Sequence, residues 1–204
     1  MIPVARMLRN SLPFLVVETG HPVPSMRRHG PFAHWIRTAA GLARGEVETV
    51  DVQSTAAPAA RGYAGVIVSG SGAMVSDREP WSERTADWLR DAAHAGVPVF
   101  GICYGHQLLA HALGGEVGGN PHGIEMGTID VTLLPAAADD PLFTGLPSRI
   151  LAQASHMQAV LRLPAGAELL ATSPLDPCHA FRWGDSAWGV QFHPEFSAGH
   201  MQGY

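Results

Sequence analysis

Short apolar runs alternate with longer amphipathic segments along the first half of the chain. Helical spacing of apolar residues predicts one helix that opens at Pro31 and ends near Gly45. It predicts a second helix from Pro80 to His94, with Gly96 as its stop signal. The apolar runs predict buried strands at 14–18, 47–52, 63–69 and 97–102. Strands that alternate with helices form βαβ units, so we expect a mostly parallel sheet with helices on both faces.

The pattern changes after Gly115 to short strands that are separated by turns. The expected strands cover residues 128–134, 149–154, 168–172, 179–183 and 186–192. Their short connections predict antiparallel pairing, and Gly184 with Asp185 predicts a two-residue hairpin turn of type II′. The sequence therefore predicts a three-layer α/β fold, with a mostly parallel central sheet and an antiparallel C-terminal extension.

Length and composition indicate one globular domain. A chain of 204 residues with 46% hydrophobic residues is long enough for one core and too short for two large ones. We interpret residues 11–204 as this domain and residues 1–10 as a candidate disordered leader. The apolar run after Arg9 is too short for a membrane span, so no membrane association is expected.

The charged residues and cysteines exclude several kinds of chemistry. All 13 basic residues are arginine, which excludes a Schiff-base lysine, a P-loop lysine and a Ser-Lys dyad. No basic stripe with interleaved aromatic residues is present, so nucleic acid is not an expected partner. Cys103 and Cys178 do not form the dense framework of a secreted disulfide protein, and we expect a cytoplasmic location.

The segment 97–115 combines a buried strand with a following helix, and Cys103 lies between them. A nucleophile on such a tight turn needs neighbours with almost no side chain, and Gly101 and Gly105 meet this need. The N-terminus of the helix directs free N–H groups at the sulfur and favours the thiolate. Cys103 is therefore a candidate nucleophile, although a lone cysteine at a strand end is also compatible with a small buried apolar residue.

A cysteine nucleophile needs a base, and the base needs a partner that orients its second ring nitrogen. The segment WGVQFHPEF contains both, because His193 and Glu195 follow a buried strand at 188–192. If this strand ends at the same sheet edge as the strand before Cys103, His193 can reach the sulfur and Glu195 can bind Nδ1. With 11 histidines in the chain, a His-x-Glu pair also arises by chance, and His193 is then an ordinary strand-end residue.

Together the two motifs resemble those of the class I glutamine amidotransferases, whose glutaminase domains carry GxCxGxQ for the nucleophile and HPE for the base and its partner. The resemblance covers residues 66–196, with the motifs in the same order. Within the family, the sequence most resembles the glutaminase domain of GMP synthases. It implies a flavodoxin-like fold and hydrolysis of the γ-amide of L-glutamine to glutamate and ammonia through a cysteinyl thioester. It implies no cofactor, and a synthetase or acceptor partner that receives the ammonia. Because members of this family usually continue past HPE into a packing helix, we expect this domain, which stops at Tyr204, to lack that helix.

The same resemblance assigns residues to the binding site. The implied catalytic residues are Cys103, His193 and Glu195, and the implied oxyanion hole consists of the backbone N–H groups of Ser71 and Tyr104. The implied substrate-binding residues are Gln107, Ser155, Met157 and Gln158. Gln107 is also compatible with a solvated position in the first helical turn. Glu125 is interpreted as a structural or acceptor-facing residue, and no role follows for His156.

The same residues are compatible with other functions. A γ-glutamyl peptidase of the same superfamily cleaves γ-glutamyl bonds without a transfer partner. A catalytically silent binding or regulatory module can keep the fold, although the intact triad argues against it. A dinucleotide site at SGSGAM lacks the third glycine and the acidic residue of that motif. No metal site is expected, because the paired histidines at 29 and 34, and at 106 and 111, are five apart and do not share a helix face.

Overall fold

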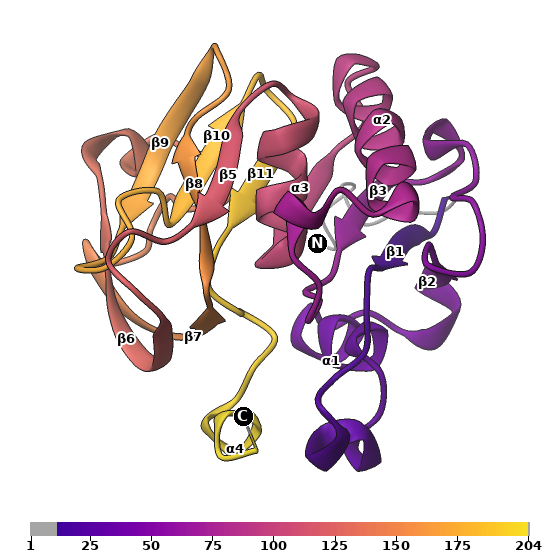
Figure 1. The fold of residues 1–204 in the computed structure, drawn as a ribbon. Helices are drawn as coiled ribbons and strands as arrows, with labels where there is room; N and C mark the ends of the chain where they lie inside the picture. Colours follow the sequence, from indigo (N-terminus) through magenta and orange to yellow (C-terminus); the bar gives the residue numbers. More distant parts are fainter. Residues whose placement is uncertain (1–11, 204) are drawn as a thin grey trace, which may run out of the picture.

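A computed structural model describes residues 12–203, so the expected leader at 1–10 lies outside the described residues. Nine of the described strands form one sheet in the order β2-β1-β3-β4-β11-β10-β9-β6-β7 (Figure 1). The parallel strands are β1 (Phe14–Glu18), β2 (Val47–Asp51), β3 (Gly65–Val68), β4 (Val99–Ile102) and β11 (Ala187–Val190). The antiparallel extension contains β10 (Ala180–Trp183), β9 (Ala167–Thr172), β6 (Glu125–Leu133) and β7 (Arg149–His156). A separate antiparallel pair consists of β5 (Glu116–Gly119) and β8 (Gln158–Arg162).

Helices cover both faces of the parallel half, as the alternation of segments predicted. The α-helices are α1 (Phe32–Ala39), α2 (Pro80–His94), α3 (Tyr104–Ala112) and α4 (Ala198–Met201). Short 3₁₀ helices are η2 (Pro24–His29), η3 (Arg44–Glu46), η4 (Ala60–Gly62), η5 (Val75–Asp77) and η6 (Pro135–Ala138). None of the helices within residues 12–203 is both long enough and apolar enough to cross a membrane.

Two hydrophobic cores lie on opposite faces of the sheet. Successive residues of β1 show this arrangement, because Leu15 and Val17 belong to the core under α2 and α3, whereas Val16 belongs to the core under α1. Strands that are buried on both faces need an uninterrupted apolar run, which explains why β1, β3 and β4 were recognisable as short apolar segments. The three-layer α/β prediction is therefore confirmed.

Element boundaries in the first half agree with the predictions to within about six residues. The first helix ends at Ala39 rather than near Gly45, because Gly41 adopts φ +66° and ends it earlier. The strand before Cys103 begins at Val99 rather than Val97, because the Val97 N–H still bonds the end of α2. These differences leave the layers and their order unchanged.

Several boundaries in the second half differ from the predictions. Strand β6 begins at Glu125, three residues before the predicted start. Gly127 adopts φ +116° but remains within the strand and pairs with Ala154. The hairpin between β10 and β11 has three connecting residues, 184–186, so the two-residue turn was wrong. Strands β5 and β8 were not predicted, because the EVGG segment of β5 shows no apolar alternation.

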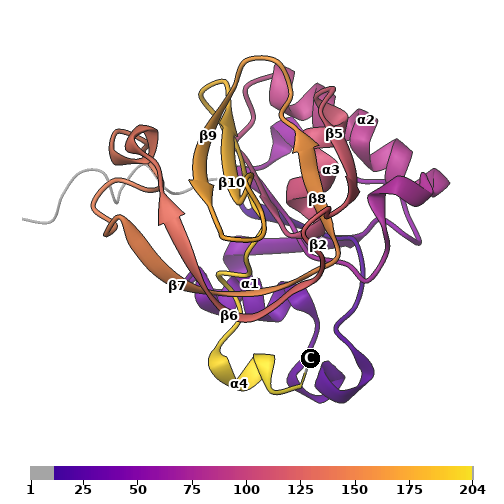
Figure 2. The ribbon, with the colours of Figure 1, turned by 60° about the vertical axis from the view of Figure 1, so that its left-hand side comes forward.

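The C-terminal segment returns to the N-terminal part of the described chain. Figure 2 shows α4 beside the indigo segment that contains η2. The Ser25 hydroxyl donates to the Gly203 carbonyl over 2.8 Å, and the His200 ring stacks on Trp35 with 4.4 Å between centroids. These contacts hold the chain that follows the HPE motif against α1 and η2.

The tight turn at Cys103 depends on glycine because three backbone segments meet there. A Cβ on Gly101 would collide with the Gly105 carbonyl. A Cβ on Gly105 would lie 2.5 Å from the Val68 carbonyl oxygen and 2.8 Å from the Val68 Cβ. Helix α3 therefore lies so close to β3 and β4 that no residue other than glycine fits at positions 101 and 105.

We expect Gly105→Ala to lower the free energy of unfolding by about 1–3 kcal/mol, because the added methyl group must displace strand backbone. This loss exceeds the roughly 1 kcal/mol that alanine gains over glycine in a helix. Urea denaturation measures the difference. Gly45→Ala is the matched control, since a Cβ there meets nothing within 4 Å and its unfolding free energy should change little. Equal stability of the two variants would contradict the close approach.

Candidate active site

The parallel pairing of β4 with β11 brings two distant motifs to one edge of the sheet. Ile102 pairs with Val190, and the Cys103 N–H donates to the Val190 carbonyl over 2.9 Å. Cys103 follows β4 directly, and His193 follows β11 by three residues. Both side chains therefore emerge at the carboxyl ends of neighbouring strands, where parallel sheets place their binding sites.

Cys103 occupies a strained backbone conformation at the start of α3. Its φ of 53° and ψ of −103° are rare for a residue with a side chain. The turn directs the sulfur toward β7, where the thiol contacts the Ser155 carbonyl oxygen at 3.9 Å. Cys103 is the N-cap residue of α3, so the free N–H groups of the first helical turn lie next to it. Local strain, a helix N-terminus and near-complete burial thus coincide at one thiol.

His193 connects the thiol to Glu195. Its Nδ1 lies 2.8 Å from Glu195 Oε1, and its ring lines the same pocket as the Cys103 thiol. The Phe196 ring stacks on the imidazole with 4.0 Å between centroids and fixes the plane of the ring. Burial lowers the pKa of His193, but the charges of Glu195 and Cys103 outweigh burial and raise this pKa to about 10. The geometry therefore favours an imidazolium beside the Glu195 carboxylate.

The loop after β3 lies against the same two side chains. A Cβ on Gly70 would be 2.9 Å from His193 Cε1 and 3.8 Å from Cys103 Cβ, so only glycine fits there. Thr19 braces this loop, because its hydroxyl donates to the Ser69 carbonyl over 2.9 Å and its N–H donates to the Ser69 hydroxyl over 3.0 Å. Ser71, a predicted oxyanion donor, follows the braced segment and lines the pocket.

Tyr104, the second predicted oxyanion donor, is the first residue of α3 and also lines the pocket. Its side chain is engaged elsewhere, because the hydroxyl lies 2.6 Å from the Ser82 hydroxyl and the ring stacks on Trp81. The group that Tyr104 can offer at the thiol is therefore its backbone N–H at the beginning of the helix.

A pocket of about 280 Å³ opens beside the sulfur. This volume suits a ligand of amino-acid size rather than a large cofactor. The pocket lining includes all the residues that were predicted to bind substrate, namely Gln107, Ser155, Met157 and Gln158. Its lining includes three large apolar side chains that are exposed, Ile124 by 58%, Met126 by 56% and Met157 by 49%.

Gln107 is buried, which excludes its interpretation as a solvated residue of the first helical turn. Its amide nitrogen donates to the Gln158 carbonyl and to Gln191 Oε1, both over 2.8 Å. With both N–H groups engaged, the Gln107 carbonyl oxygen is the part left to accept a hydrogen bond from a ligand. Gln191 was not predicted, although it lies two residues before His193 in the motif WGVQFHPEF.

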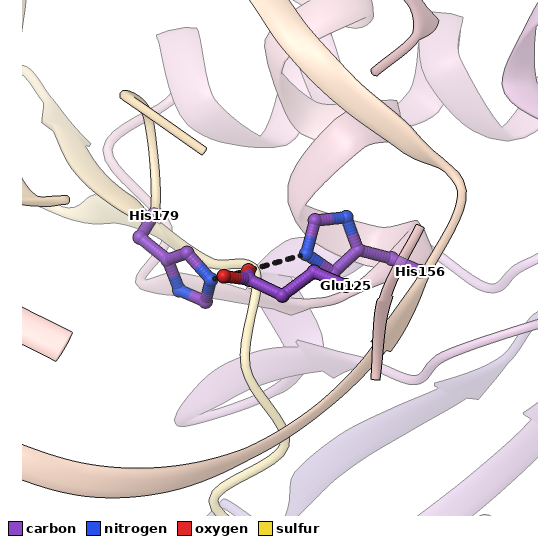
Figure 3. Close-up of side chains that lie close together, drawn as sticks. All are labelled: Glu125, His156 and His179. Atoms are coloured by element: carbon purple, nitrogen blue, oxygen red, sulfur yellow. Dashed lines mark hydrogen bonds and ion pairs between the residues drawn. The ribbon is translucent and has the colours of Figure 1, made fainter. Parts of the chain in front are cut away.

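A second polar cluster lies behind the wall of the pocket and contains Glu125, His156 and His179 (Figure 3). Glu125 Oε2 lies 3.0 Å from His156 Nε2 and 2.8 Å from His179 Nε2. Burial raises the pKa of Glu125, but hydrogen bonds from the two histidines and Ser173 outweigh burial and hold it below its usual range. The sequence assigned no firm role to Glu125 or His156 and did not single out His179, because these residues are far apart in the chain.

Comparisons with known proteins agree with this geometry. The profile of the family described as glutamine amidotransferase class-I matches residues 29–203. A glutamine-hydrolysing GMP synthase of Aeropyrum pernix is 43% identical over 132 residues, which cover 65% of this chain and 24% of that protein. A protein of Archaeoglobus fulgidus, named as one subunit of a glutamine-hydrolysing GMP synthase, is 39% identical over 117 residues, which cover 57% of this chain and 62% of that protein. The chain thus matches about a quarter of the first relative's length and less than two thirds of the second's.

Solved structures share the fold over most of the chain. A glutamine amidotransferase from Methylobacillus flagellatus has a TM-score of 0.75 at 26% identity, over 93% of this chain and 73% of that chain. A glutamine amidotransferase from Thermotoga maritima has a TM-score of 0.76 at 21% identity, over 95% of this chain and 81% of that chain. The second likeness is one of fold alone.

The raised pKa of His193 predicts a pH-dependent contribution to stability. Because the folded-state pKa is about 10 and the ordinary value is 6.5, this contribution is fully present below pH 6.5 and is lost as the pH rises toward 10. We expect Glu195→Gln to lower the free energy of unfolding by about 3–5 kcal/mol near pH 6.5, since it removes one partner of a buried pair. The deficit should shrink steadily toward pH 10.

Urea denaturation of both proteins at several pH values measures this difference. Glu79→Gln is the matched control, because Glu79 is exposed and its replacement should give a small difference that does not change with pH. A Glu195→Gln deficit that stays constant from pH 6.5 to 10 would show that the carboxylate does not hold the charge of His193.

Proposed function

Because the chain belongs to the class I glutamine amidotransferase family, we propose that it hydrolyses the γ-amide of L-glutamine to glutamate and ammonia. The observation that most directly supports this proposal is the buried connection from Cys103 through His193 to Glu195 beside a small pocket. A thiol, an imidazole and a carboxylate in this order form a nucleophile, a base and an orienting group. We also propose that residues 11–204 act as a single glutaminase domain.

In the proposed first step, the Cys103 thiolate attacks the γ-carbonyl carbon of glutamine and forms a tetrahedral intermediate. The backbone N–H groups of Ser71 and Tyr104 donate to the developing oxyanion, a type of contact that typically contributes about 10²–10³ in rate. The imidazolium of His193 gives its proton to the departing nitrogen. The carbon–nitrogen bond breaks, ammonia leaves, and a thioester between glutamate and Cys103 remains.

In the second step, neutral His193 removes a proton from water, and the resulting oxygen nucleophile attacks the thioester. The carbon–sulfur bond breaks, glutamate leaves, and Cys103 returns to the thiolate while His193 is again protonated. Glu195 keeps the ring oriented in both steps and favours its charged form. The stacked Phe196 ring prevents rotation of the imidazole during the cycle.

The polar groups of the pocket suit the amino-acid end of glutamine. We propose that Ser155 and the backbone of Met157 and Gln158 bind the α-carboxylate and the α-amine. The Gln107 carbonyl oxygen supplements them, because its amide nitrogen is already engaged within the protein. In this arrangement the Cys103 thiol lies at the other end of the bound glutamine, next to its γ-amide.

We further propose that a synthetase partner receives the ammonia. The Archaeoglobus relative is named as one subunit of a GMP synthase, and a subunit works together with at least one other chain. Three exposed apolar side chains, Ile124, Met126 and Met157, line the pocket, and a group of exposed apolar side chains is typical of a docking surface. Because the nucleophile must remain a free thiol, we place this activity in the reducing cytoplasm.

A γ-glutamyl peptidase has the same nucleophile and pocket chemistry but no transfer partner. A comparison of kcat/KM for glutamine and for γ-glutamyl dipeptides separates the two, and a preference for the dipeptides would favour the peptidase. Assays with and without added cell extract show whether a partner is needed for turnover.

We expect Cys103→Ala to abolish ammonia release from glutamine, by at least about 10⁴-fold in kcat, while the fold remains intact. Cys178→Ala is the matched control, because Cys178 is buried away from the pocket and burial raises the pKa of its thiol. A glutamine-mimicking electrophile should label Cys103 stoichiometrically and Cys178 hardly at all. Retention of most activity in Cys103→Ala would overturn the proposed function, and equal, slow labelling of both thiols would favour a silent module.

A further inference from the structure

Three potential metal-ligand side chains converge in the antiparallel half of the sheet, apart from the catalytic thiol. Glu125 begins β6, His156 ends β7, and His179 directly precedes β10. Their exposed fractions are 2%, 5% and 0%. One ligand atom from each side chain lies within 4.8 Å of the others, and Figure 3 shows both rings pointing at the carboxylate. Buried groups of this kind are rare unless they are paired or coordinate a metal ion.

The hydrogen bonds of His156 determine which of its nitrogens carries a proton. Nδ1 lies 2.9 Å from the Gln158 carbonyl oxygen, which can only accept, so Nδ1 must donate. In a neutral ring the lone pair is then on Nε2. This nitrogen lies 3.0 Å from Glu125 Oε2, which is also electron-rich. Two lone pairs at this distance require a cation between them, either a proton or a metal ion.

The surroundings of the cluster resemble the outer shell of a metal site. A metal-binding histidine usually donates its other N–H group to a carbonyl or carboxylate, as His156 does to Gln158. A metal-binding carboxylate is usually hydrogen-bonded as well, and the Ser173 hydroxyl donates to Glu125 Oε1 over 2.7 Å. For His179, no hydrogen bond within residues 12–203 engages Nδ1, so this nitrogen can carry the ring proton and leave Nε2 as a ligand.

We propose that Glu125, His156 and His179 bind a divalent transition-metal ion, with zinc as the expected ion. Two imidazoles and one carboxylate are ligands that Zn²⁺ accepts, with bonds of about 2.0–2.2 Å. A tetrahedral site with such bonds separates its ligand atoms by about 3.3 Å. The present separations of 3.0 and 2.8 Å between Glu125 and the two histidines would have to widen by a few tenths of an ångström, and the two imidazole nitrogens, which lie within 4.8 Å of each other, would have to reach the same separation. The spacing of histidines along the sequence predicted no metal site, and this proposal reverses that expectation.

Charge and access are compatible with a cation in this position. Asp176 is buried next to the cluster, and its Oδ2 has no hydrogen-bond partner in the described part of the chain. A bound cation would supply Glu125 with a countercharge. His156 also lines the catalytic pocket, so one ligand of the cluster borders a cavity that opens to solvent. The remaining coordination position is left to water.

The bound ion would join β6, β7 and the segment that precedes β10. It would also hold His156 against the Gln158 carbonyl, which accepts the hydrogen bond from Gln107 as well. The proposed role is therefore structural support of the pocket wall, and it does not depend on the proposed activity.

The test uses the full chain without a histidine tag and with zinc alone as the probe. We expect about one Zn²⁺ per chain by elemental analysis. Zinc at a hundredfold excess over Kd should raise the Tm by about 5 °C or more, and a chelator should reverse the shift. Co²⁺ should give a visible spectrum without a sulfur charge-transfer band, because both cysteines lie outside the proposed ligand set.

Three variants separate metal binding from hydrogen bonding. His179→Gln keeps a donor for Glu125 but removes a ligand, so it should fold and lose more than about 100-fold in zinc affinity. His122→Gln, at an exposed histidine, and Cys103→Ala, at the catalytic thiol, should both bind zinc like the unmodified chain. Absence of a zinc-dependent Tm shift in the unmodified chain, or unchanged affinity in His179→Gln, would overturn the proposal in favour of a proton between His156 and Glu125.

Discussion

The active-site geometry depends on one contact, the parallel pairing of β4 with β11. This pairing connects the strand before Cys103 to the strand before His193, although a long antiparallel excursion separates them in sequence. Because both strands run in the same direction, their carboxyl ends meet at one edge, and the residues that follow them come within reach of each other. A reversed β11 would send His193 to the opposite edge of the sheet.

The loops around this edge are tied together before any ligand arrives. Thr19 holds the loop after β3 through Ser69, and Gln107 joins α3 to the Gln158 carbonyl and to Gln191. These hydrogen bonds cross between elements that follow different strands. A preorganised site of this kind spends no binding energy on ordering its donors when charge develops on the substrate.

Two buried histidine–carboxylate pairs lie on different sides of the pocket wall, and burial acts on them in the same way. Burial disfavours charge on His193 and on Glu125, yet the nearest partners outweigh it in both cases, so the pKa of His193 rises and that of Glu125 falls. Charged groups of this kind tolerate few substitutions, because removal of one partner leaves the other charge buried and unpaired. The pocket wall therefore depends on the pairing of these buried charges as well as on the packing of apolar side chains.

The sequence by itself determined the parallel layers, the turn at Cys103 and the motif around His193, because apolar periodicity, glycine placement and short motifs act over a few residues. It did not reveal β5, whose glycines hide any alternation, nor the three-residue hairpin before β11. Only the tertiary structure decided that β11 lies beside β4 and that Glu125, His156 and His179 meet. Those contacts depend on strand order and register, which bring together residues 31 and 54 positions apart and leave no local signal in the chain.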